Sequence, residues 1–348
     1  MSAKKEQSEN TWQGDFIQLM EQLSEPTRQP YPEVGSTTKE LIYTENKLQL
    51  FRYNALDIKQ KRTPILITYA LVNRPYIVDL EPERSLVMRL LEKGYPVYLV
   101  DWGYPDSTDC FTSLNDYING YLYRCIQQVK RDSKRKKIDL LGICQGGVFS
   151  LCYSALHPGD VRKLATLVTP VDFHTGNNTL SHWANEVDTA LLNNHAGNVS
   201  GQLISQLFKT IKPFQINREK FRKIEPLLTK KGGLDTFLRM EKWLNDNPDL
   251  AGLAAQEFVV NFYQQNRLHQ QTLSIGGAVV DMTKIKSPVL NLYATKDHIV
   301  PASSTRALGQ HIKPALYQEH ALHGGHIGAF ISLKTQRDLI NRLNEWLA

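Results

Sequence analysis

The sequence predicts an α/β fold built on a mostly parallel, doubly wound sheet. Of the 348 residues, 41% are hydrophobic and 22% charged, which provides enough apolar side chains to bury one large core. Short apolar, β-branched runs recur along the chain and alternate with segments of helical periodicity. Continuous apolar runs are typical of strands covered by helices on both faces, and this alternation indicates parallel crossover units.

The expected elements follow one another in a simple order. Five apolar runs are predicted as strands, at 64–69, 96–101, 138–142, 164–169 and 288–293, with helical patterns at 82–93, 114–132 and 148–156. Strand-like runs are missing from about 175 to 275, where 201–211 and 233–244 have helical periodicity. We therefore expect a polar N-terminal lead-in over 1–35, a core formed by 36–175 and 276–348, and a helical cap insertion over 176–275.

Charge and cysteine content narrow the function classes. A formal net charge of +6 suits a small anionic substrate and does not by itself predict nucleic-acid binding. The four cysteines form no CxxC pair, so neither a metal site nor a disulfide framework is expected. Residues 1–16 lack the apolar stretch of a signal peptide, and no window approaches about eighteen consecutive apolar residues. We expect a cytoplasmic protein with reduced thiols and no membrane span.

One segment indicates the chemistry. Gly142-Ile-Cys144-Gln-Gly146 lies directly after an apolar strand and directly before a helix. It is the nucleophile-elbow pattern G-x-S-x-G with sulfur in place of oxygen. The helix N-terminus favours a thiolate, and the backbone N–H of Gln145 would point at a developing oxyanion. The pattern predicts Cys144 as the nucleophile of an α/β-hydrolase fold; the alternative is a small buried residue at a tight turn.

An acid and a histidine follow the nucleophile in the order that this fold requires. Asp297 lies just beyond the strand predicted at 288–293, where ligands meet open α/β sheets. His326 lies in a glycine-rich loop after a short strand expected at 315–319. His323 is the alternative base, but glycines flank His326 and allow its backbone to approach the elbow. His298 adjoins Asp297 and is a candidate for the substrate pocket.

Other segments carry weaker signals. The loop after the first strand usually supplies the second oxyanion donor, and the backbone N–H of Val72 is favoured over simple chain reversal. Trp102, just past the strand at 96–101, is expected to line the substrate pocket or to pack beneath it. Cys125 and Cys152 fall in helical patterns and are expected to be inert core thiols. The aromatic segment 258–268 is either a wall of the substrate channel or core packing.

Taken together, these motifs resemble the catalytic subunit of class III polyhydroxyalkanoate synthases, the short, two-subunit polyester synthases. The matching segments are 69–76 with 79–80, 101–106 (Asp-Trp-Gly-Tyr-Pro-Asp), 142–147, 297–301 and 324–328. The resemblance implies an acyltransferase that polymerises (R)-3-hydroxyacyl-CoA, with 3-hydroxybutyryl-CoA as the expected monomer, and releases CoA. It implies that Cys144 carries the acyl chain as a thioester with His326 as general base. It also implies that Asp297 helps deprotonate the 3-hydroxyl, directly or through His326.

The resemblance implies partners as well. They are the growing polyester chain and a dissimilar second synthase subunit, in a homodimer or hetero-oligomer at the surface of cytoplasmic polymer granules. No cofactor or metal is expected, because the CoA thioester is the substrate and CoA the product. The basic run at 130–137 is expected to be a solvated helix end, with attraction of CoA phosphates or an acidic partner as the alternative.

Two other functions stay open. One is a thiol-dependent hydrolase of esters or lactones, which would pass the acyl group to water. The other is a non-catalytic granule-associated protein with a degenerate site, against which the intact set of Cys144, Asp297 and His326 argues.

Overall fold

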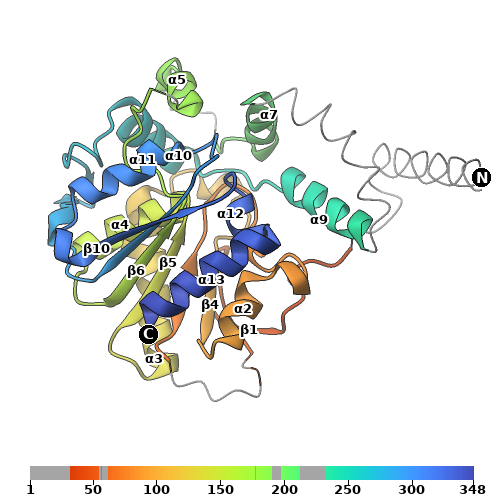
Figure 1. Ribbon diagram of the computed structural model, residues 1–348. Helices are drawn as coiled ribbons and strands as arrows, with labels where there is room; N and C mark the ends of the chain where they lie inside the picture. The colour runs from red at the N-terminus through yellow and green to blue at the C-terminus, as the bar shows by residue number, and fades with distance from the viewer. Residues whose placement is uncertain (1–31, 55, 57–61, 177, 190–196, 212–231) are drawn as a thin grey trace, which may run out of the picture.

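The computed structural model describes residues 32–54, 56, 62–176, 178–189, 197–211 and 232–348. Within them an eight-stranded sheet runs in the order β1-β2-β4-β3-β5-β6-β9-β10 (Figure 1). The strands are β1 (Lys39–Glu45), β2 (Leu48–Tyr53), β3 (Ile65–Thr68), β4 (Val97–Asp101), β5 (Ile138–Ile143), β6 (Val161–Leu167), β9 (Val289–Ala294) and β10 (Tyr317–Leu322). From β4 to β10 every neighbouring pair is parallel, whereas β2 is antiparallel to both β1 and β4.

The structure confirms the predicted fold class and all five apolar strands. The short strand expected at 315–319 begins later and forms β10. The hairpin of β1 and β2 was not predicted, because β1 is polar and only partly buried at the edge of the sheet. In β2 only Leu48, Leu50 and Tyr53 are buried, so this strand lacks the continuous apolar run of the central ones.

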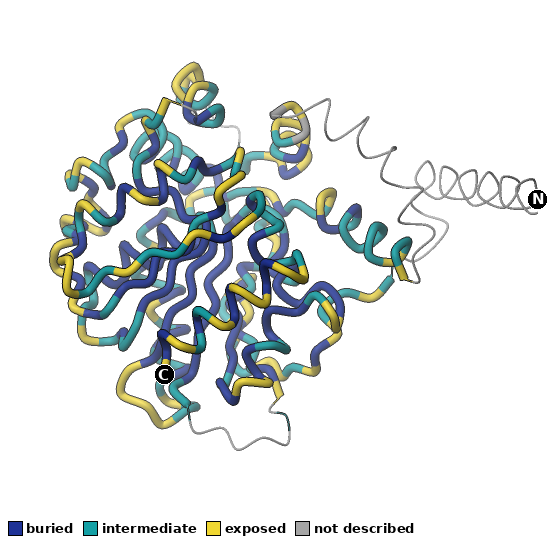
Figure 2. The backbone as a smooth tube through the Cα atoms, in the orientation of Figure 1, coloured by how far each residue is buried: buried dark blue, intermediate teal, exposed yellow. Residues whose placement is uncertain are grey.

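Helices cover both faces of the sheet. On one face lie α2 (Leu86–Glu92), α12 (Gly328–Ile331) and α13 (Leu333–Leu347), and on the other lie α3 (Tyr123–Ser133) and α4 (Gln145–Leu156) (Figure 1). Successive strand residues divide between the two layers: Leu140 packs with the α3 and α4 side, and Leu141 with the α2 and α13 side. Figure 2 shows the consequence, a buried central sheet under helices exposed only on their outer faces.

The helical patterns are confirmed with local departures. The pattern at 82–93 is a 3-10 turn, η2 (Pro82–Arg84), followed by α2, which begins where the Ser85 hydroxyl accepts the Met88 N–H at 2.8 Å. The pattern at 114–132 starts as a π-helix, η4 (Asp116–Leu122), and continues as α3. The remaining short helices of the core are η1 (Pro75–Val78), η3 (Ser107–Asp109), η6 (Met282–Lys284), α11 (Ala302–Arg306), η7 (Ala307–Gln310) and η8 (Pro314–Leu316).

The segment expected as an insertion is helical where it is described. It contains α5 (Thr179–Asn185), α7 (Gly201–Ile211), α9 (Gly233–Asn245), α10 (Gly252–Phe258) and the π-helix η5 (Val259–Gln264), before a small hairpin of β7 (Ser274–Ile275) and β8 (Ala278–Val279). In Figure 1, α5 and α7 lie at the top of the view and α9 lies to the side. The domain boundaries stay a prediction, and most of the lead-in lies outside the described residues. Among the described helices, none is both long and apolar enough to span a membrane.

Candidate active site

Cys144 occupies the turn between β5 and α4. Its backbone has φ 53° and ψ −123°, a conformation that residues other than glycine rarely adopt. Such a conformation costs about 1–3 kcal/mol and persists only where the surroundings enforce it. Here the Cys144 N–H donates to the Leu167 carbonyl at 2.9 Å, and the Cys144 carbonyl accepts from Gly147 N at 2.9 Å. Strand β6 and helix α4 therefore hold the elbow from both sides and present the thiol at the helix N-terminus.

Glycines allow β5 and α4 to meet at this elbow. A Cβ on Gly142 would lie 2.5 Å from the Gly147 Cα, and one on Gly146 would lie 2.2 Å from the Thr68 carbonyl oxygen. A Cβ on Gly147 would lie 1.9 Å from the Thr169 hydroxyl oxygen. The motif predicted the need for glycine at 142 and 146. The need for glycine at 147 arises from its contact with Thr169, in the segment after β6.

Gly146→Ala is therefore expected to lower the free energy of unfolding by about 1–3 kcal/mol, because the new methyl group meets backbone that cannot easily move. Urea denaturation measures the change. The matched control is Gly159→Ala, since a Cβ at Gly159 would meet no atom within 4 Å. Equal stability losses in the two variants would contradict the tight packing of the elbow.

The structure brings the three predicted catalytic side chains together. His326 Nδ1 lies 2.7 Å from Asp297 Oδ2, and Cys144 lies close enough to raise the pKa of the same imidazole. Asp297 Oδ1 accepts the backbone N–H groups of Ile299 and Val300, both at 2.9 Å. These two bonds fix the carboxylate, which in turn fixes the imidazole and leaves its Nε2 to face the thiol.

Electrostatics favour a charged imidazole in this position. Burial alone would lower the pKa of His326, but the negative charges of Asp297 and Cys144, together with hydrogen bonds to both, outweigh burial and raise it above the ordinary value. The Asp297 side chain is fully buried and His326 is 9% exposed, so water screens these charges little. The geometry suits a thiol nucleophile whose proton passes to an oriented imidazole.

The neighbouring histidines take other positions. His323 is exposed, and its backbone carbonyl accepts the Thr335 hydroxyl at 2.8 Å. His298 is also exposed, in the same loop as Asp297. The residue that contacts Asp297 is thus His326 rather than His323.

The loop after β3 places Val72 between two anchored residues. The Leu71 N–H donates to the Gln145 side-chain oxygen at 2.9 Å, and the Asn73 N–H donates to the Asn247 side-chain oxygen at 2.9 Å. Between them, the Val72 N–H donates no hydrogen bond to any residue that the structure describes. The N–H of Gln145 opens α4, where helix geometry offers it no acceptor. The two predicted oxyanion donors are therefore available.

Sequence reasoning missed the side-chain contacts of Gln145 and Asn247. Gln145 was considered only for its backbone N–H, and Asn247 was not considered. The bond from Asn73 to Asn247 joins residues 174 positions apart in the sequence, so no local pattern signals it.

Trp102 packs beneath this loop. It is 5% exposed, and its ring lies edge-to-face against Tyr117 and Phe149, with centroids 5.5 and 6.0 Å away. Its indole N–H donates to the Tyr69 carbonyl at 2.9 Å. These contacts fit packing beneath the site, and the role of Trp102 in lining the substrate pocket stays a prediction.

The aromatic end of the insertion reaches Cys144. Tyr263 of η5 and Tyr69, which follows β3, each have a raised pKa, mainly from burial and further from the charge of Cys144. The Tyr263 ring also packs against Phe173 and Phe258, at centroid distances of 5.0 and 5.8 Å. Tyr263 therefore belongs to the surroundings of the thiol as well as to the core.

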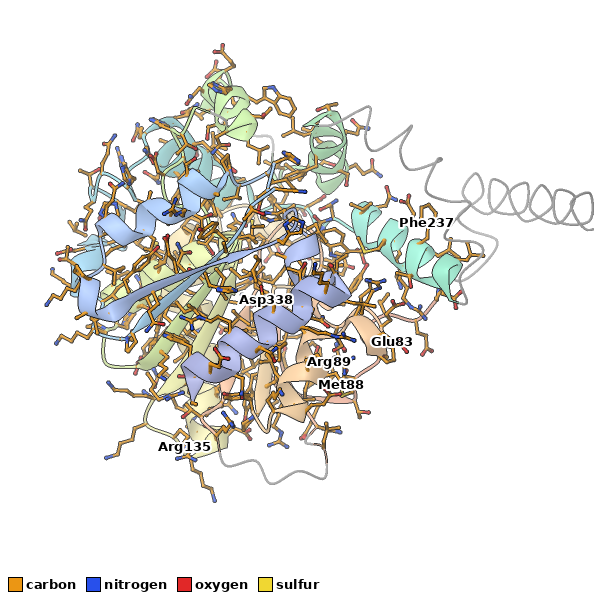
Figure 3. All side chains as sticks on the ribbon, viewed as in Figure 1. Glu83, Met88, Arg89, Arg135, Phe237 and Asp338 are labelled. Atoms are coloured by element: carbon orange, nitrogen blue, oxygen red, sulfur yellow. The ribbon has the colours of Figure 1, made fainter. Side chains whose placement is uncertain are left out.

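The remaining predicted features lie away from this centre. Cys125 and Cys152 are fully buried, and burial raises the pKa of both thiols, that of Cys152 to about 12. The basic run at 130–137 ends α3 and precedes β5, about 20 Å from the elbow at the opposite end of that strand. Arg135 in this run projects at the base of the molecule, opposite α5 and α7 (Figure 3). This location favours a solvated helix end.

Comparisons with known proteins agree with this geometry. The family model of the α/β hydrolase fold matches residues 63–332, and that of the poly-beta-hydroxybutyrate polymerase (PhaC) N-terminus matches residues 28–90. The chain is 44% identical over 317 residues to poly(3-hydroxyalkanoate) polymerase subunit PhaC of Allochromatium vinosum, covering 90% of this chain and 89% of that protein. It belongs to the PhaC polymerase family. The same subunit of Synechocystis is 42% identical over 323 residues, covering 91% of this chain and 85% of that protein.

Solved structures show the fold of this PhaC family member more broadly. Monoacylglycerol lipase of Paleococcus ferrophilus matches with a TM-score of 0.52 at 16% identity, covering 82% of this chain and 95% of that one. A thermophilic esterase of Thermogutta terrifontis matches with a TM-score of 0.52 at 13% identity, covering 90% and 98%. At this identity the likeness is one of fold alone, and it confirms the α/β-hydrolase architecture.

Proposed function

We propose that this protein polymerises (R)-3-hydroxyacyl-CoA, with 3-hydroxybutyryl-CoA as the expected monomer, into a polyester and releases CoA. The observation that supports it best is the hydrogen-bonded pair of His326 and Asp297 beside Cys144 at a nucleophile elbow. That set belongs to a chain of the PhaC polymerase family. Family membership supplies the substrate class, and the site supplies groups able to carry out the transfer.

In the first step the Cys144 sulfur attacks the thioester carbonyl of the substrate while its proton resides on His326. A tetrahedral oxyanion forms, for which the backbone N–H groups of Gln145 and Val72 are the proposed donors. As the carbon–oxygen double bond reforms, the bond to the CoA sulfur breaks, and the imidazolium of His326 returns a proton to the leaving thiolate. The products are an acyl thioester on Cys144 and free CoA.

In the second step the 3-hydroxyl of another hydroxyacyl-CoA attacks the acyl thioester on Cys144. An ester bond forms, the carbon–sulfur bond to Cys144 breaks, and the Cys144 thiolate takes up the proton, so the lengthened chain is now a CoA thioester that can return to Cys144 by the first step. His326 accepts the hydroxyl proton and Asp297 orients and stabilises the resulting imidazolium; direct deprotonation by Asp297 is the alternative. In this structure both oxygens of Asp297 already have partners, Oδ2 with His326 and Oδ1 with two backbone N–H groups. This arrangement favours the route through His326.

Sulfur as the attacking atom also suits polymerisation. Exchange of one thioester for another is nearly isoenergetic, so the acyl group stays reactive toward an incoming hydroxyl. A serine ester would lie lower in energy and would favour loss of the acyl group to water. No metal or further cofactor enters this scheme, because the CoA thioester brings its own activated acyl group.

The decisive experiment supplies purified protein with 3-hydroxybutyryl-CoA. We expect release of free CoA, formation of insoluble polymer, and a mass increment of hydroxybutyryl units on the tryptic peptide containing Cys144. Soluble 3-hydroxybutyrate as the sole product would instead identify a hydrolase. Absence of CoA release, even with a second subunit added, would identify a non-catalytic granule-associated protein.

The proposal extends to partners and location. It includes a dissimilar second synthase subunit, a homodimeric or hetero-oligomeric assembly, and action at the surface of cytoplasmic polymer granules. Addition of that subunit is expected to raise the rate of CoA release, measured at fixed concentration of this chain. Full polymerisation by the isolated chain, without any gain from the second subunit, would contradict this part of the proposal.

A further inference from the structure

The insertion touches the loop after β3 at several points. From the end of α9 the chain turns back over the sheet toward α10 (Figure 1). On this path Trp243 donates its indole N–H to the Arg74 carbonyl at 2.8 Å, and the Trp243 carbonyl accepts the Asn73 side-chain amide at 3.1 Å. Asp246 accepts the Tyr76 hydroxyl at 2.9 Å. Trp243 is only 2% exposed, so this contact is sealed from solvent.

Asn247 makes the contact that bears on the chemistry. Its side-chain oxygen accepts the backbone N–H of Asn73, which has a left-handed φ of 59°. Its amide nitrogen donates to the Ser205 hydroxyl and to the Leu244 carbonyl, the latter at 3.2 Å. The amide plane is therefore fixed from both ends, and the oxygen that holds Asn73 has a set direction.

Gln145 makes the matching contact on the other side of Val72. Gln145 directly follows the nucleophile in the chain. Its side-chain oxygen accepts the Leu71 N–H at 2.9 Å. Of three successive backbone N–H groups in this loop, the first and the third are thus bound by side-chain amides. The middle one, of Val72, has no acceptor among the described residues.

We propose that Asn247, together with the Gln145 side chain, is a positioning residue that aims the Val72 N–H at the oxyanion formed on the substrate carbonyl. This inference rests on the proposed acyl transfer and extends it, since it makes the insertion part of the catalytic machinery. Preorganised donors stabilise charge that develops in the transition state, and a misplacement of about 1 Å can cost up to about 100-fold in rate. Loss of the Asn247 contact should act on that step.

The test separates acyl transfer from thiol reactivity. Alkylation of Cys144 by iodoacetamide needs a reactive thiol beside His326 but passes through no oxyanion, whereas acylation by 3-hydroxybutyryl-CoA does. For Asn247→Ala we expect the rate of CoA release in the first turnover to fall roughly 10- to 100-fold. In the steady state this loss should appear in kcat. The KM should change little and the alkylation rate should stay near that of the wild type.

The matched control is Asn198→Ala. Asn198 also links the insertion to the core, through a hydrogen bond from its side-chain amide to the Asp106 carbonyl, and within the described part of the chain it forms no hydrogen bond with residues 71–73. This control should acylate like the wild type.

Each other outcome has a definite meaning. Equal acylation rates in Asn247→Ala and the wild type would overturn the inference and leave the proposed function standing. Parallel losses of acylation and alkylation would show a general disturbance of the site and would also overturn it. CoA release that persists in Cys144→Ala would instead overturn the proposed function.

Discussion

Replacement of Cys144 by alanine is expected to abolish CoA release from 3-hydroxybutyryl-CoA, with a fall on the order of 10⁴-fold or more. In the proposed mechanism the Cys144 sulfur carries the acyl chain, so this variant should form neither the thioester nor any polymer. Alanine removes only the sulfur from the side chain, and His326 and Asp297 can keep their contact. The measurements are CoA release, polymer yield and the mass of the peptide that contains residue 144.

The control for this variant is Cys152→Ala. Cys152 lies two helical turns along α4, is fully buried, and has a pKa raised to about 12, so it stays a neutral core thiol. Its replacement is expected to spare CoA release at a temperature where the fold is intact. Comparable activity losses in the two variants would contradict Cys144 as the nucleophile.

Asp297→Asn is expected to lower the rate of CoA release by roughly 10²- to 10⁴-fold. The Asp297 carboxylate helps to raise the pKa of His326, against burial, which lowers it. Without that charge the pKa of His326 must fall, so the imidazole loses its proton at a lower pH than in the wild type. An NMR titration of the His326 ring measures this shift, and the pH dependence of Cys144 alkylation should move in the same direction.

His323→Gln is the matched control for this second prediction. His323 was the alternative base, but it is exposed, and its backbone carbonyl accepts the Thr335 hydroxyl. The variant should retain the wild-type rate of CoA release and the titration of His326. If His323→Gln loses activity as severely as Asp297→Asn, the assignment of His326 as the base is wrong.

Strong local constraints made much of the site visible in the sequence. The reversal from β5 into α4 needs small residues on both sides of the nucleophile, and the contacts of Gly142 and Gly146 show why. The central strands are buried on both faces, so each has a continuous apolar run. The edge hairpin of β1 and β2 lacks such a run, and it escaped prediction for that reason.

Contacts between distant segments of the chain could be identified only in the structure. The flanking glycines favoured His326 over His323 in the sequence, but the 2.7 Å contact of His326 Nδ1 with Asp297 is seen only in the structure. The packing role of Trp102 follows from its bond to the Tyr69 carbonyl, across the β3–β4 part of the sheet. No fixed spacing in the sequence predicts either contact, because each depends on the register and packing of separate strands and loops.

By itself the sequence determined the elbow, the order of nucleophile, acid and base, and the resemblance to a polyester synthase, because these features lie in short segments with strict local requirements. Only the tertiary structure decided how Val72 is presented. Its N–H lies between anchors supplied by Gln145 of α4 and Asn247 of the insertion. Such hydrogen bonds form between segments that folding alone brings together, and local sequence does not encode the distance between them.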